Sequence, residues 1–201
     1  MREEFGGGNV VCANVGVQQF GALDRLTADD WRWVLDVNVL GVVNTVDAFL
    51  PLLRSSTGTR RIVVTSSSAV MVPGVRLGAY TASKFAVMGY GETLRQELAG
   101  EGIGVSVLFP AGMSSRHLES SVKARPTELG PSVTLPDDID AMLASRDMDA
   151  AVHTATPEHA TRNLLAALRD DERYIVTHGS YRGGLVARLD DLVRAYDRAQ
   201  D

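Results

Sequence analysis

The chain has 201 residues, of which 45% are hydrophobic and 22% charged, the composition of an ordinary soluble globular protein with enough sequence for one domain. Its formal net charge of −5 offers no electrostatic basis for binding nucleic acid or an acidic membrane surface. We therefore expect a single domain over residues 1–201, with neither nucleic acid nor membrane among its partners.

One cysteine and the first residues bear on the cellular compartment. Cys12 cannot form an internal disulfide, and its apolar surroundings indicate a buried small side chain. The opening MREEFGGG lacks the basic and apolar stretches of a secretory signal. No window reaches the ~18 uninterrupted apolar residues of a membrane span. These features predict a reducing, cytoplasmic location.

The first part of the chain alternates strand-like and helix-like segments. Residues 9–17, rich in valine, predict a buried strand. Residues 27–51 predict a long helix, with Thr27 as its N-cap, apolar residues at helical spacing and Pro51 at its end. Residues 60–68 turn abruptly from apolar to polar, which predicts a second strand that ends in serines.

The rest of the chain continues the alternation. A helix is predicted from Ala79 to Gly100, followed by a strand over 104–109 that Pro110 ends. Residues 111–157 are irregular, and an excursion of this length is typical of a functional lid, here a substrate lid. The remaining predicted elements are a helix from Thr156, a strand at 172–178 and a helix at 183–200.

This order of elements predicts the α/β class, with a doubly wound parallel sheet of about four strands. In such sheets the ligand binds beyond the carboxyl ends of the strands. The candidate site residues are therefore the polar residues that follow the predicted strands, namely Asn14, Ser66–Ser68, Pro110–Ser115 and His178.

Tyr80 and Lys84 lie four positions apart, so in a helix both side chains share one face. Lys84 is one of only two lysines in the chain. A phenol has a pKa near 10, and a nearby ammonium would lower it by favouring the phenolate. With a serine from the preceding strand end, such as Ser67, the pair suits proton transfer coupled to hydride transfer at a carbonyl. The spacing alone also arises by chance.

The motifs together resemble the classical short-chain dehydrogenases/reductases. The matching residues are ANVG at Ala13–Gly16, VNVLG around Asn38, the serines Ser66 and Ser67, YTASK at Tyr80–Lys84, and PAG at Pro110–Gly112. Their order and spacing fit the family from Asn14 to the C-terminus.

The resemblance implies a role for each matching residue. Tyr80 would be the general acid/base, Lys84 would lower its pKa and hold the nicotinamide ribose, Ser67 would position the substrate carbonyl, and Asn38 would support a proton relay. The cofactor would be NAD or NADP, the substrate a small carbonyl compound or alcohol, and the assembly a homo-oligomer, dimer or tetramer. The residues expected at the cofactor are Asn14, Gly16, Tyr80, Lys84, Pro110 and Gly112.

The sequence departs from the family pattern at its beginning. No strand precedes the glycines Gly6–Gly8, so they do not form the family's phosphate-binding turn. We therefore expect a partial Rossmann-like sheet that lacks the first three family strands, a truncated chain, and impaired cofactor binding. Residues 9–17 would then form an apolar edge strand, which is a pairing liability.

Two other functions stay open on this sequence. The chain could be a binding or scaffold protein without redox activity, or a cyclase or lyase that reuses Tyr80 and Lys84 for acid/base work. No metal site is expected, because the spacing of His117, His153, His159 and His178 does not suit one.

Overall fold

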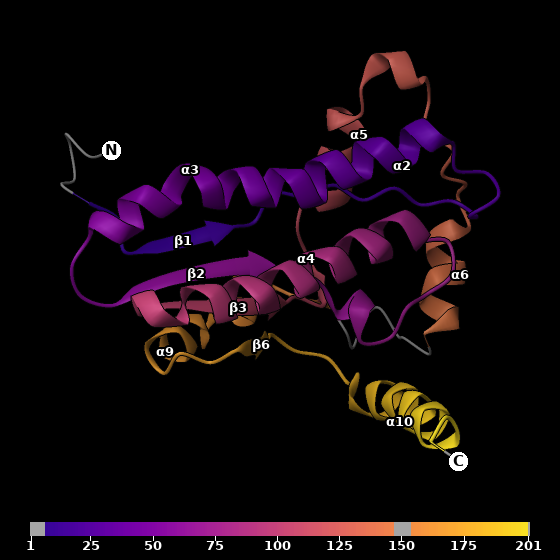
Figure 1. Cartoon of the computed structure of the whole chain (residues 1–201). Helices are drawn as coiled ribbons and strands as arrows, with labels where there is room; N and C mark the ends of the chain where they lie inside the picture. Colours follow the sequence, from indigo (N-terminus) through magenta and orange to yellow (C-terminus); the bar gives the residue numbers. More distant parts are fainter. Residues whose placement is uncertain (1–6, 147–153, 201) are drawn as a thin grey trace.

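A parallel sheet forms the centre of the computed structural model, which describes residues 7–146 and 154–200 (Figure 1). Its strands stand in the order β1-β2-β3-β6, and every neighbouring pair is parallel. They are β1 (Val10–Ala13), β2 (Arg60–Thr65), β3 (Ile103–Phe109) and β6 (Tyr174–Val176). The predicted α/β class and four-stranded parallel sheet are confirmed.

One face of the sheet is covered by two long helical segments (Figure 1). The first runs through α2 (Ala28–Leu35), a π-helix (Asp36–Leu40) and α3 (Gly41–Ser55), and the second is α4 (Gly78–Leu98). The first segment begins as predicted, because Thr27 and Asp30 form a reciprocal capping box. The core under these helices is mostly valine, with Val11, Val42, Val46, Leu53, Ile62, Val64, Val87, Val105 and Val107 all buried.

The opposite face is covered over only part of its width. Helices α8 (Pro157–Thr161) and α9 (Leu164–Arg169) follow the 111–157 segment, and α9 packs on Val63, Leu108 and Ile175. That cover does not extend to β1, where Val10 is 51% exposed and Cys12 is also exposed. The prediction of a buried Cys12 is therefore wrong, because only one face of β1 has a helix packed on it.

Two predicted helix ends also differ from the structure. Pro51 lies inside α3, which continues to Ser55, so the proline does not end the helix. The second long helix passes Gly100 in a short 3₁₀ turn (Ala99–Glu101) and stops at Gly102, which has φ of +68°. A left-handed residue at this position is the usual helix stop, and Gly102 rather than Gly100 provides it.

The 111–157 segment contains more regular structure than predicted. It has helices α5 (His117–Ala124) and α6 (Asp138–Ser145), a 3₁₀ turn (Thr127–Leu129), and two short parallel strands, β4 (Gly112–Met113) and β5 (Thr154–Ala155). Residues 147–153, with His153, lie outside the described part. Two buried carboxylates tie the segment to the rest of the fold, through the ion pairs Asp30–Arg125 (2.7 Å) and Asp138–Arg25 (2.8 Å).

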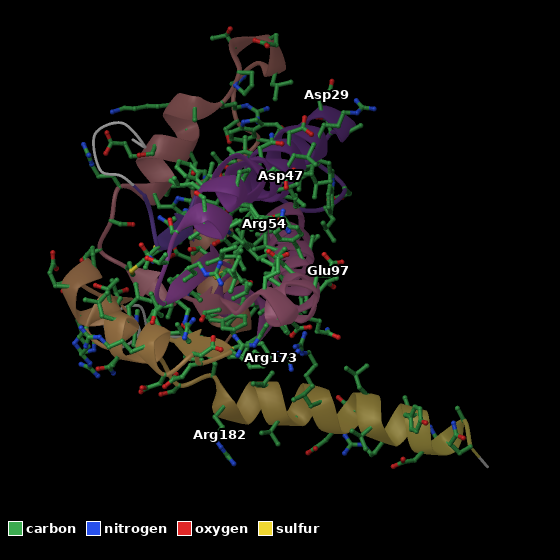
Figure 2. The ribbon with its side chains drawn as sticks, turned by 60° about the vertical axis from the view of Figure 1, so that its left-hand side comes forward. Asp29, Asp47, Arg54, Glu97, Arg173 and Arg182 are labelled. Atoms are coloured by element: carbon green, nitrogen blue, oxygen red, sulfur yellow. The ribbon has the colours of Figure 1, made fainter. Side chains whose placement is uncertain are left out.

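The last helix, α10 (Arg182–Arg198), begins against the body and then extends away from it (Figures 1 and 2). Leu185 packs against the main core, whereas Leu192 and Tyr196 are more than 60% exposed. Elsewhere, the continuous helix Ala28–Ser55 meets the length and composition of a membrane span, a criterion that core helices of soluble proteins also meet. The absence of membrane partners stays a prediction.

Candidate active site

The carboxyl ends of β1 and β2 meet the first turns of α4, and most of the predicted catalytic residues converge there. Asn38, Ser67, Tyr80 and Lys84 are all buried, at 0%, 7%, 9% and 3% exposure. Buried polar groups require partners, so their hydrogen bonds define the geometry of the site.

The two candidate serines have different tasks. The Ser66 hydroxyl donates a hydrogen bond of 2.8 Å to the main-chain carbonyl of Lys84, which fastens the end of β2 to α4. The Ser67 hydroxyl accepts from the Ala69 amide, and its interaction with the Tyr80 phenol lowers the pKa of that phenol. Of the two serines, only Ser67 is therefore described as acting on the phenol; its role as the catalytic serine stays a prediction.

Tyr80 and Lys84 lie on one face of α4, with Nζ of Lys84 5.5 Å from the centroid of the Tyr80 ring. Nζ donates a hydrogen bond of 2.9 Å to the main-chain carbonyl of Thr65. Burial lowers the pKa of Lys84 to about 8. The amine is thus anchored at the end of β2, one residue before the serines.

Burial also acts on Tyr80, whose pKa is raised above its usual value. The Ser67 side chain and the positive charge of Arg146 offset part of that rise. The expected net lowering of the Tyr80 pKa by Lys84 is therefore not found, because desolvation of the phenolate outweighs the favourable interactions. Tyr80 is a protonated phenol near neutral pH in this structure.

Asn38 lies in the π-helix and links three parts of the chain. Its Oδ1 accepts from the Val17 amide at 2.7 Å, and its Nδ2 donates to the Val17 carbonyl and to the Ser83 hydroxyl. Ser83 in turn donates to the main-chain carbonyl of Tyr80. A π-turn within an α-helix is common at functional sites. Here it directs Asn38 both to the loop after β1 and to α4.

The residues predicted at the cofactor lie around the same edge of the sheet. A Cβ on Gly16 would stand 3.3 Å from Nζ of Lys84, so the loop after β1 passes directly over the amine. Asn14 is exposed at the end of β1. The carbonyl of Pro110 accepts from the Ser68 amide, and that of Gly112 hydrogen-bonds to the His178 ring.

Two residues near Tyr80 were not identified from the sequence. The His117 ring is 6.3 Å from the Tyr80 ring, and burial, with a smaller effect of the Lys84 charge, lowers its pKa. Arg146 reaches Ser68 and adds positive charge near the phenol. Both belong to the 111–157 segment, where no periodic pattern indicated that they would fold back over α4.

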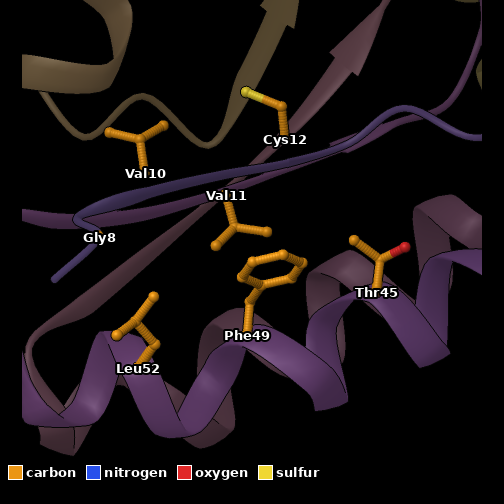
Figure 3. Close-up of a pocket in the computed structure, with 7 residues that line it drawn as sticks. All are labelled: Gly8, Val10, Val11, Cys12, Thr45, Phe49 and Leu52. Atoms are coloured by element: carbon orange, nitrogen blue, oxygen red, sulfur yellow. The ribbon is translucent and has the colours of Figure 1, made fainter. Parts of the chain in front are cut away.

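A separate hollow lies away from these residues, between β1 and α3 (Figure 3). It has a volume of about 170 Å³, and Val11, Phe49 and Leu52 turn toward it while Cys12 points to the other side of the strand. No group of three or more His, Cys, Asp or Glu within residues 7–146 and 154–200 could hold a metal ion.

Comparisons with known proteins give a consistent result. A C alpha-dehydrogenase from Sphingobium sp. strain SYK-6 is 31% identical over 182 residues, which cover 90% of this chain and 58% of that protein. A 3-dehydrosphinganine reductase from Arabidopsis thaliana is 32% identical over 126 residues, 62% of this chain and 38% of that protein. The chain thus spans about three fifths or less of the length of these relatives.

A solved structure is similar to this chain in the same way. A short-chain dehydrogenase/reductase from Burkholderia phymatum in complex with NAD superposes with a TM-score of 0.83 at 27% identity, covering 96% of this chain and 69% of that one. The family model for short chain dehydrogenases matches residues 1–126, well over half of the sequence. By this match, the chain belongs to the short-chain dehydrogenase/reductase family.

Proposed function

We propose that the protein is an NAD(P)-dependent oxidoreductase that interconverts a carbonyl compound and the corresponding alcohol. The observation that carries this proposal is the buried group of Ser67, Tyr80 and Lys84 at the carboxyl ends of the strands. A protonated phenol with a hydroxyl beside it is the arrangement that a carbonyl oxygen needs when it gains a proton.

In the reducing direction Tyr80 donates its phenolic proton to the substrate oxygen, and the Ser67 hydroxyl holds that oxygen by a hydrogen bond. The raised pKa of Tyr80 keeps the proton in place until charge develops on the oxygen. The Lys84 ammonium then lies near enough to favour the phenolate that remains. A reduced nicotinamide, when bound, supplies the hydride.

Asn38 is proposed to act behind these residues. Its three hydrogen bonds hold the loop after β1 against α4, and the Ser83 hydroxyl continues this chain of hydrogen bonds to the Tyr80 backbone. We propose that Asn38 both positions the Tyr80 turn and supports a proton relay that returns the proton to the phenol.

The residues present fit the nicotinamide ribose end of the cofactor. Nζ of Lys84 uses one described hydrogen bond, to Thr65, and an ammonium has three donors. The absence of a Cβ at Gly16 lets the chain pass close to that amine. Lys84 and Gly16 would hold the ribose, with Asn14, Pro110 and Gly112 beside the nicotinamide. Because these contacts serve one end of the dinucleotide, we expect weak binding from them alone.

The 111–157 segment is proposed to be the substrate lid. Met142 of α6 is buried in one cluster with Tyr80, Phe20 and Leu77. The ion pairs from Arg125 and Asp138 fix the segment to the region around α2, so its helices form one wall of the site. We also propose that the protein is cytoplasmic and forms a homo-oligomer. Light scattering of the purified protein would test the oligomeric state.

Hydride transfer is the direct test of this function. The protein would be incubated with NADH or NADPH carrying deuterium at the transferred position and a panel of ketones and aldehydes. Mass spectrometry should find deuterium on the carbinol carbon of at least one product, and Tyr80→Phe should abolish it. A titration that shows binding of neither cofactor would contradict the proposal and favour a non-redox role.

A further inference from the structure

Arg146 carries a positive charge into the site, and no carboxylate in the described part of the chain pairs with it. The two buried carboxylates elsewhere each have an arginine, in the pairs Asp30–Arg125 and Asp138–Arg25. Over residues 7–146 and 154–200, no carboxylate forms an ion pair with Arg146 or Lys84. The described surroundings of Tyr80 therefore contain two cations that lack a protein anion.

The guanidinium of Arg146 is held in one position from several sides. One terminal nitrogen donates to both the carbonyl and the hydroxyl of Ser68, each at 3.2 Å. The group lies over the Tyr181 ring, 5.2 Å from its centroid. On the remaining side its alkyl stem packs on Gly74, where a Cβ would come within 2.8 Å of Cδ. A guanidinium that binds a planar anion through two parallel N–H donors requires such a fixed orientation.

The described residues do not complete the hydrogen bonding of this group. Nε of Arg146 is buried and has no partner in the described part of the chain, and a thioether sulfur 3.9 Å away is the described contact of Nη1. Burial accordingly lowers the pKa of Arg146. A buried cation is ordinarily paired, because its desolvation is otherwise not compensated. A bound anion would provide that pairing.

We propose that Arg146 is an anion subsite of the substrate pocket and that the substrate is an oxo acid or hydroxy acid whose carboxylate binds this guanidinium. The reacting oxygen meets Tyr80 and Ser67, so the carboxylate lies on the Ser68 side of the reacting carbon. Arg146 is then a residue that determines specificity. The inference rests on the proposed function only in taking Tyr80 as the point of reaction.

The charges around this subsite agree with the choice of an anion. Among the described residues, the titratable groups near Tyr80 are Lys84 on its own helix, His117 from α5 and Arg146 just after α6. Tyr181, just before α10, lies under the guanidinium. None of these four side chains is a carboxylate, so a bound anion meets no like charge from them.

Calorimetric binding of matched ligands tests the proposal. Pyruvate, acetoacetate and 4-oxopentanoate would each be titrated against the corresponding primary amide, with and without NADH. At least one acid should bind about tenfold or more tightly than its amide, which is the effect of one charge-assisted hydrogen bond. Arg146→Gln should remove this preference, Arg146→Lys should retain part of it, and Arg169→Gln, on the far face of the sheet, should leave it unchanged.

A second variant separates position from charge. Gly74→Ala keeps the arginine but displaces its stem, so the preference for the acid should fall while the variant still folds. Equal binding of every acid and its amide, binding of no acid, or a preference that survives Arg146→Gln would overturn the proposal. Since the titration without NADH needs no hydride transfer, a retained preference without redox activity would refute the proposed function alone.

Discussion

Two regions of the sheet differ in how they meet their surroundings, namely the carboxyl ends of β1 and β2 and the outer edge of β1. At their carboxyl ends, buried polar side chains from three elements hydrogen-bond to one another and to main-chain carbonyls. Beside the outer edge of β1, the lining is largely apolar, a hollow remains, and Val10 is half exposed. A hollow therefore marks apolar surface that lacks cover, whereas the candidate chemistry lies where polar groups are most completely packed.

The largest expected effect on activity concerns the polar site at the carboxyl ends of β1 and β2. Tyr80→Phe should reduce the rate of hydride transfer by about 10²–10⁴-fold, the usual contribution of a general acid/base. Stability at pH 7 should change little, because the phenol is protonated in the folded and unfolded states alike and its raised pKa has no cost at that pH. Single-turnover kinetics and urea unfolding would measure the two quantities. Retained activity in this variant would remove Tyr80 from the mechanism.

Asn38→Ala tests whether the hydrogen bonds of Asn38 also stabilise the fold by connecting the loop after β1 to α4. The change leaves the Val17 amide and carbonyl without their described partner, so we expect a loss of about 3 kcal/mol in unfolding free energy. Asn44→Ala, at an exposed position of the same helical segment, should cost less than about 0.5 kcal/mol. Equal losses in the two variants would contradict the assigned role.

Lys84→Met separates function from stability at the same site. The pKa of Lys84 is lowered from 10.5 to about 8, so below pH 8 the folded state bears the cost of a buried charge. Removing that charge should stabilise the fold at pH 7 by about 2 kcal/mol, after allowance for the lost hydrogen bond to Thr65.

The pH dependence gives the sign of this effect. Between pH 8 and 10.5 the unfolded wild type holds a proton that the folded state has released, so its stability rises with pH. The advantage of Lys84→Met should therefore shrink over that range in urea unfolding series. Lys123→Met, at the only other lysine and exposed, should show no such trend. A constant advantage from pH 7 to 10.5 would contradict the lowered pKa.

The smallest effect is expected at the apolar edge. Val107→Ala in β3, where the side chain is 1% exposed, should cost about 2 kcal/mol through a cavity. Val10→Ala in β1 should cost less than about 0.5 kcal/mol, because that side chain is half exposed already. Similar losses in thermal unfolding would show that something covers β1 in solution and would remove the contrast between the two regions.

Much of the sheet could be predicted from the sequence because its strands are short valine-rich runs that end in polar residues. The outcome for β1 differs, since an apolar run shows that a face can be buried and not whether a helix lies on it. Cys12 was misplaced for this reason. Pro51 was misplaced because a proline ends a helix only where its missing amide cannot be tolerated, and tertiary packing decides that.

The candidate site divides along the same line. Tyr80 and Lys84 lie in the first turns of α4 and Ser67 follows the end of β2, so their convergence follows from the order of strands and helices. His117 and Arg146 reach the site through the fold of the 111–157 segment, which depends on ion pairs over long sequence separations such as Asp138–Arg25. No local pattern encodes such a contact, so these two residues required the structure.

The π-turn at Asp36–Leu40 positions the side-chain amide of Asn38 and also determines which way the residues after it face. An extra residue in one turn rotates everything that follows by about 100° relative to a regular α-helix. Trp33 and Val34 before it pack in one cluster with Val17, whereas Val42 and Val46 after it face the main core. Deleting one residue of this turn would turn one of these faces toward water, so the length of the segment is constrained from both sides.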